Sequence, residues 1–110
     1  MESVTFFVKG SSFEPYRVVF SLDGQRMTAE CSCQAGQNGQ VCKHRVDILI
    51  GDFSAVVEKN ILIQEKFLNR IKGTNLLDKL LLFKEAEKQL EIQKKKVEFS
   101  KKELAKIMRG

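Results

Sequence analysis

Residues 30–49 of the chain read ECSCQAGQNGQVCKHRVDIL. This stretch holds all three cysteines and the only histidine among the 110 residues. They form two pairs with eight residues between them, Cys31-x-Cys33 and Cys42-x-His44. The spacer is small and polar, and Gly36 and Gly39 allow unusual backbone angles within it. Four interpretations are open: a metal site, a disulfide, a catalytic thiol, or a chance grouping of these residues.

The spacing of each pair favours a metal site. On an extended strand, residues two apart point to the same face with Cα atoms about 6.6 Å apart. Both thiolates of the first pair can therefore reach one cation at about 2.3 Å. Residues i and i+2 of a helix point in nearly opposite directions. Cys42 is therefore expected in the entry turn of a helix, where the helix N-terminus favours a thiolate.

Three thiolates and one imidazole fill a tetrahedron, which is the pattern of a structural zinc site. We therefore predict one Zn²⁺ held by the two pairs together, namely by Cys31, Cys33, Cys42 and His44. The site would carry a formal charge of −1, and Lys43 and Arg45 are placed to offset it.

The alternatives to a structural metal are less well supported. A disulfide needs an oxidising compartment and would leave one of three cysteines unpaired. A Cys31–Cys33 bridge would also be strained. A catalytic Cys42 with His44 as its base lacks a third group to orient the histidine, and a zinc hydrolase needs a vacant coordination position. Simple buried cysteines stay an open alternative. We expect a protein that is not an enzyme and takes no small-molecule substrate.

Cys-x-Cys, a short spacer and Cys-Lys-His before an apolar helix resemble the SWIM zinc finger. That family is named for its occurrence in chromatin-remodelling ATPases and in transposases of the MuDR kind. The resemblance covers about Tyr16 to Gly51, with all four ligand positions filled. It implies a β-hairpin followed by a helix around one zinc, and a role in binding DNA or protein. Residues 53–110 lie outside it.

Strands are expected before the ligands. In residues 4–8, Val4, Phe6 and Val8 alternate with Phe7, as in a strand buried on one face. Residues 16–22 predict a second strand, and Asp23-Gly24 predicts a two-residue turn into a third strand over 25–33.

Helices are expected after the ligands. A short helix over residues 43–50 follows a loop over 34–41, and a helix over 61–71 ends before Gly73. Asn75 is expected to cap a long helix over 76–108. The predicted class is α+β: a small β-hairpin sheet with a zinc-bound short helix, then an all-α helical hairpin with a long C-terminal helix. The predicted domains are the finger, residues 1–52, and the helical, coiled-coil-like extension, residues 53–110.

The long helix carries apolar residues on two lines. One line is apolar at every seventh position from Leu76 to Leu104, and Ile92 and Phe99 form the other. A coiled coil also needs apolar residues three places after each position of the first line, but those positions are mostly small or polar. One interpretation is a helix pair closed within the chain. The other is contact with a second copy, giving a homodimer, or with another protein. The candidate interface residues are Leu90, Ile92, Val97, Phe99 and Leu104.

The formal net charge of +5 lies entirely in residues 51–110, which carry fourteen basic and nine acidic side chains. Basic surfaces favour nucleic acid, acidic proteins or anionic membranes. Candidate nucleic-acid contacts are Lys43, Arg45, Lys94, Lys95, Lys96, Lys101 and Lys102. Glutamates interleave with these lysines, so a solvated helix face is the competing interpretation. No signal peptide opens the chain and no apolar run approaches the ~20 residues of a membrane helix. We expect an intracellular protein, cytoplasmic or nuclear, without membrane contact.

Overall fold

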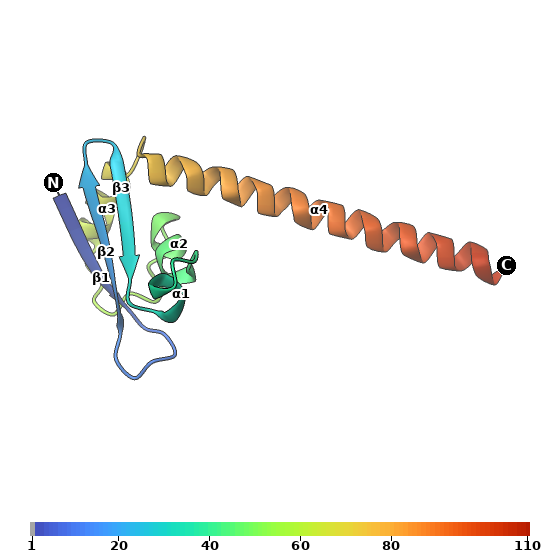
Figure 1. Cartoon of the computed structure of the whole chain (residues 1–110), viewed down its shortest axis with the longest axis horizontal. Helices are drawn as coiled ribbons and strands as arrows, with labels where there is room; N and C mark the ends of the chain where they lie inside the picture. Colours follow the sequence, from blue (N-terminus) through green and yellow to red (C-terminus); the bar gives the residue numbers. More distant parts are fainter. Residues whose placement is uncertain (1) are drawn as a thin grey trace. The chain divides into compact units, whose positions relative to one another are not determined.

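The structure is a computed structural model that describes residues 2–110. Three strands come first, β1 (Glu2–Val8), β2 (Tyr16–Asp23) and β3 (Arg26–Cys31). Four helices follow, α1 (Gln34–Gln37), α2 (Lys43–Leu49), α3 (Ile61–Arg70) and α4 (Asn75–Arg109). The strands form one antiparallel sheet in the order β1-β2-β3 (Figure 1). The predicted α+β class, with a long C-terminal helix, is confirmed.

The chain divides into two compact units, Met1–Asp78 and Lys79–Gly110. The first contains the sheet, α1, α2, α3 and the first turn of α4. The second consists of the remainder of α4. The predicted division into domains 1–52 and 53–110 concerns independent folding and stays a prediction.

One face of the sheet forms the core of the first unit. Side chains alternate between the two faces of a strand, and the register places Phe6 opposite Val18 and Val18 opposite Cys31. The buried residues of this face are Phe6, Val8, Val18, Phe20, Leu22, Met27 and Cys31. Phe7 points to the other face and is exposed, as predicted.

Helices cover the buried face. The Phe67 ring of α3 lies 5.2 Å from that of Phe6 and 4.9 Å from that of Phe20, measured between ring centroids. Ile48 and Leu49 of α2 are also buried, and α1 and α2 both lie beside β3 (Figure 1).

The apolar stripe of α3 is narrower than the sequence suggests. Ile61 and Leu62 share its apolar pattern, but they are 69% and 71% exposed. Phe67 and Ile71, four residues apart and therefore on one side of the helix, are the buried positions. The buried part of the apolar stripe is therefore confined to the C-terminal end of the helix.

The β2–β3 turn lies one residue later than predicted. Asp23 pairs with Arg26 in the ladder, so the two-residue loop is Gly24-Gln25 and not Asp23-Gly24. Gly24 has a φ of 62°, the positive value that such a turn requires at its first position.

The start of α4 is capped by Thr74 and not by Asn75. The Thr74 hydroxyl accepts a hydrogen bond from the Leu77 N–H at 3.4 Å and donates one to the Ile71 carbonyl at 2.6 Å. The Asn75 side-chain oxygen instead accepts the Met27 N–H at 2.8 Å, and the Asn75 N–H donates to the Gln25 carbonyl at 3.1 Å. Asn75 thus fastens the first turn of α4 to the β2–β3 hairpin.

Residues 53–58, which carried no clear pattern, run beside the outer edge of β1. Val56 forms an antiparallel bridge with Val8. The Lys9 N–H donates to the Ala55 carbonyl and the Val57 N–H to the Phe7 carbonyl, both at 2.8 Å. These bonds satisfy backbone groups that an open sheet edge would leave unpaired.

The two units differ in charge. Met1–Asp78 carries nine basic and nine acidic side chains, whereas Lys79–Gly110 carries ten basic and five acidic. The net charge of the chain therefore belongs to the helical unit. Across residues 2–110, no helix has both the length and the apolar character needed to span a membrane.

Candidate metal centre

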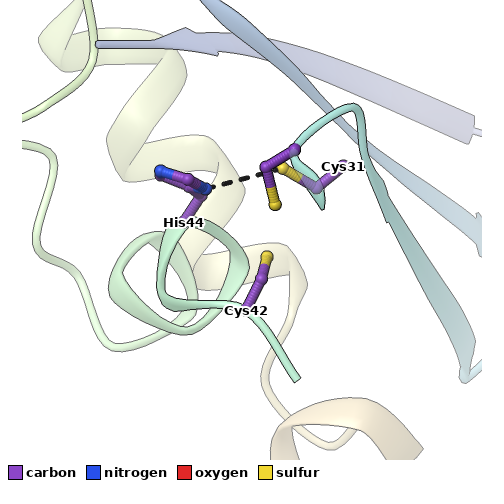
Figure 2. A group of neighbouring side chains, drawn as sticks. Cys31, Cys42 and His44 are labelled. Atoms are coloured by element: carbon purple, nitrogen blue, oxygen red, sulfur yellow. Dashed lines mark hydrogen bonds between the residues drawn. The ribbon is translucent and has the colours of Figure 1, made fainter. Parts of the chain in front are cut away.

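The two Cys/His pairs come together at one end of β3. One donor atom from each of Cys31, Cys33, Cys42 and His44 lies within 4.8 Å of every other. The three cysteines are buried and His44 is half-buried. Figure 2 shows Cys31, from the end of β3, and Cys42 and His44, from the start of α2, directed toward one another. Four donors around a zinc ion would be separated by about 3.6–3.8 Å, so a small closure of this cluster would complete a tetrahedron.

The sheet register positions Cys31. It stands opposite Val18 and shares the buried face with Met27, so its sulfur lies under the helices. The ladder is prolonged by Ser32, whose N–H donates to the Arg17 carbonyl at 3.0 Å and whose hydroxyl accepts the Arg17 N–H at 2.9 Å. The first ligand is therefore held by the sheet.

Cys33 caps a helical turn, α1, within residues 34–41, which were predicted to form a loop. It keeps an extended backbone, with φ −68° and ψ 165°, and α1 begins at the next residue. Its sulfur accepts the Gly36 N–H at 3.3 Å. Cysteine is not among the common N-cap residues, so the pattern gave no start signal for α1.

Gly36 packs directly on the first ligand. A Cβ at this position would stand 2.4 Å from the Cys31 carbonyl oxygen and 2.9 Å from the Cys31 Cβ. The α1 turn can therefore lie this close to the end of β3 only because residue 36 has no side chain.

The second pair opens α2, as predicted. Cys42 is the N-cap residue with an extended backbone, and His44 is the second helical residue. The His44 Nδ1 lies 3.7 Å from the Cys31 Sγ, near the ~3.6 Å expected for a sulfur and a nitrogen on one zinc ion. Nδ1 is therefore the nitrogen that faces the other donors.

The His44 ring is also held from outside the cluster. It stacks on Tyr16 with ring centroids 4.9 Å apart. A Cβ built on Gly10 would lie 3.3 Å from His44 Nε2 and 2.3 Å from the Tyr16 ring. Tyr16 and Gly10 were not among the predicted site residues, since neither carries a ligand atom and both are distant in sequence.

Burial and hydrogen bonding shift the pKa values of two thiols of the cluster in opposite directions. Burial raises the pKa of Cys31 to about 12. Burial also acts to raise the pKa of Cys33, but hydrogen bonds from the Gly36 N–H and from His44, Cys31 and Cys42 outweigh it and lower this pKa to about 6. At neutral pH the Cys33 thiol is therefore mostly ionised and the Cys31 thiol is not. A bound divalent cation would favour the thiolate form of its sulfur ligands.

Of the two basic neighbours, only Arg45 contacts the cluster. Its Nε donates to the Cys42 sulfur at 3.1 Å, while its terminal nitrogens donate to the Ala29 and Gln40 carbonyls. Lys43 is exposed. Arg45 is therefore placed to offset the charge of the site, and Lys43 makes no such contact within the described residues. The offset itself, and the contact of both residues with nucleic acid, stay predictions.

The remaining predicted residues lie in the helical unit, outside the metal cluster. They are exposed along α4 and comprise Lys94, Lys95, Lys96, Lys101 and Lys102, with Leu90, Ile92, Val97, Phe99 and Leu104. Their roles as nucleic-acid contacts and as an interface stay predictions.

Residues 16–46 match the family described as SWIM zinc finger. The matched segment begins with β2, ends within α2 and includes all four clustered side chains. The resemblance to the SWIM zinc finger that the motif suggested is therefore confirmed over residues 16–46. Neither a curated protein nor a solved structure matches the chain.

Proposed function

We propose that the finger binds one Zn²⁺ through Cys31, Cys33, Cys42 and His44, and that the chain is a non-enzymatic module for binding DNA or protein. The observation that carries the zinc site is the convergence of four donor atoms within 4.8 Å from three separate segments. Three thiolates and an imidazole are a donor set that suits zinc.

The proposed role of the zinc is structural. Four protein donors fill the tetrahedron and leave no position for water or substrate. Two of the ligands, Cys33 and Cys42, are helix N-caps. One ion would therefore fix the end of β3, α1 and α2 at once. Structural zinc sites supply about 10–16 kcal/mol at neutral pH.

Metal analysis with a ligand variant tests this site. The purified chain is expected to contain one zinc per molecule, and His44→Ala to lose it and to unfold at a lower temperature. Lys43→Ala, which alters the adjacent exposed residue, should keep both properties. A wild-type chain without zinc, or a His44→Ala variant that retains it, would refute the proposal.

Nucleic acid is the first candidate partner. The excess of basic side chains in Lys79–Gly110 supports it. Phosphate contacts release counterions, so the affinity for duplex DNA should fall steeply as salt is raised. The proposed contacts are Lys43 and Arg45 in the finger and the five lysines between residues 94 and 102.

A protein partner is the second candidate. The unit Lys79–Gly110 is one helix and holds no second element to cover its apolar side chains. Val97 and Phe99 are each 67% exposed. Contact through this helix with a second copy or another protein would bury them. Light scattering over a range of concentrations tests the homodimer, which a constant monomer mass would exclude.

Two double variants on α4 distinguish a nucleic-acid partner from a protein partner. Lys95→Gln with Lys102→Gln removes two positive charges, whereas Val97→Gln with Leu104→Gln removes two apolar side chains. For a nucleic-acid module, the first variant should lower DNA affinity and the salt dependence, and the second should not. For a protein module, the second should abolish self-association or partner binding. DNA binding unaffected by the charge variant would remove these lysines from the nucleic-acid proposal.

A further inference from the structure

Arg45 joins three segments around the proposed metal site. It is the third residue of α2, and its side chain reaches back past the helix start. Its Nε donates to the Cys42 Sγ at 3.1 Å and its Nη1 to the carbonyl of Ala29 in β3 at 3.0 Å. Its Nη2 donates to the carbonyl of Gln40, in the spacer between the ligand pairs.

Within the described residues 2–110, Arg45 is the one side chain with an N–H group that donates to the Cys42 sulfur. At most N-caps, a backbone N–H of the first turn donates to the side chain of the cap residue. Cys33 follows that pattern through the Gly36 N–H, but the Cys42 side chain accepts no capping bond from α2. The Arg45 guanidinium occupies the place of the missing amide, and it carries a full positive charge.

We propose that Arg45 is a positioning residue that sets the zinc affinity of the finger by holding the Cys42 sulfur in place. The inference rests on the proposed function, because it requires zinc at this site. The bond to the Cys42 Sγ fixes the direction of that side chain, and the other two bonds of Arg45 hold Cys42 against β3 and the spacer before metal arrives. Outer-sphere hydrogen bonds of this kind typically change metal affinity by about 10- to 100-fold.

The geometry also requires arginine in particular. A guanidinium presents several N–H donors in a rigid planar fork, which matches three acceptors lying on different segments. A lysine ammonium is a compact charge on a flexible stem and cannot reproduce these three bonds together. The side chain of Arg45 is half-buried, so water does not readily replace it.

Zinc affinity, measured by competition with a chromophoric chelator at fixed pH, tests the proposal on the full chain. Arg45→Gln is expected to bind zinc about 10- to 100-fold more weakly than the wild type. Arg45→Lys should also bind more weakly, although it keeps the charge. Lys43→Gln is the matched control, since it removes the same charge beside Cys42 from an exposed side chain, and it should change affinity less than about 3-fold.

Three results would overturn the role of Arg45. These are an Arg45→Gln affinity within about 2-fold of wild type, an equal loss in Lys43→Gln, or full affinity in Arg45→Lys. Circular dichroism at saturating zinc should show a wild-type fold in Arg45→Gln, because all four ligands remain. An unfolded variant under those conditions would assign Arg45 to the fold and not to the metal. A wild type that takes up no zinc would instead refute the proposed function itself.

Discussion

Replacing Gly36 by alanine is expected to weaken both the fold of the finger and its hold on zinc. The new Cβ would lie 2.4 Å from the Cys31 carbonyl oxygen and 3.1 Å from the Cys31 carbonyl carbon. Both atoms are backbone in the last residue of β3, so neither can rotate away. The α1 turn must therefore retreat from the strand, and the Gly36 N–H must retreat from the Cys33 sulfur.

The expected loss of stability in Gly36→Ala is the sum of three contributions. Overpacking a close contact costs about 1–3 kcal/mol. Weakening a hydrogen bond to a charged sulfur costs up to about 1.5–3 kcal/mol. Alanine offsets about 1 kcal/mol of this through its higher helix propensity. We expect a net loss of about 2–4 kcal/mol from the zinc-loaded fold, and a fall in zinc affinity of at least about tenfold, which corresponds to 1.4 kcal/mol.

Urea denaturation of the zinc-loaded protein and chelator competition measure the two effects separately. Gly24→Ala is the matched control, because Gly24 has a φ of 62° but a Cβ there would meet nothing within 4 Å. Left-handed strain should cost the control about 1–2 kcal/mol of stability without changing zinc affinity. If Gly36→Ala bound zinc as tightly as Gly24→Ala, the close approach of α1 to Cys31 would not hold the site together.

Three further predictions follow from other contacts. Phe67→Ala should destabilise the first unit by about 3–5 kcal/mol in denaturation experiments, because the ring fills the space between two phenylalanines of the sheet; a loss below about 1 kcal/mol would contradict this packing. Thr74→Val should cost about 1–2 kcal/mol through loss of the α4 cap, whereas Thr5→Val, at an exposed position, should cost much less. Chelation at neutral pH should expose three thiols to alkylation, counted by mass spectrometry, because zinc holds its sulfur ligands until it is removed; protection that persists after chelation would argue against metal.

Much of the site could be predicted from sequence because its geometry depends on local spacing. Cys31 and Cys33 share a side because an extended backbone repeats every two residues. The Cys42-x-His44 pair had to lie at a helix start, and α2 begins at Lys43. Both inferences use only backbone periodicity, which is independent of how the rest of the chain packs.

The features that escaped prediction depend on contacts distant in sequence. Asn75 was a sound N-cap candidate, but its side chain bonds to Met27, 48 residues away, and Thr74 takes the cap. The α3 stripe looked broad because Ile61 and Leu62 are apolar, yet both are exposed and the buried positions are Phe67 and Ile71. Local patterns cannot indicate which of several suitable residues a tertiary contact will occupy.

The position of the cluster relative to the aromatic core indicates what the zinc stabilises. Phe6, Phe20 and Phe67 contact one another directly, and this packing uses no metal ligand. Cys31 lies at the end of β3, and the other ligands follow it at the starts of α1 and α2. The sheet and α3 therefore have a hydrophobic core of their own, whereas the four-residue α1 buries no side chain. Because so short a helix is unstable alone, the proposed zinc would chiefly order the segment from Cys31 to His44, the part of the chain that defines the finger.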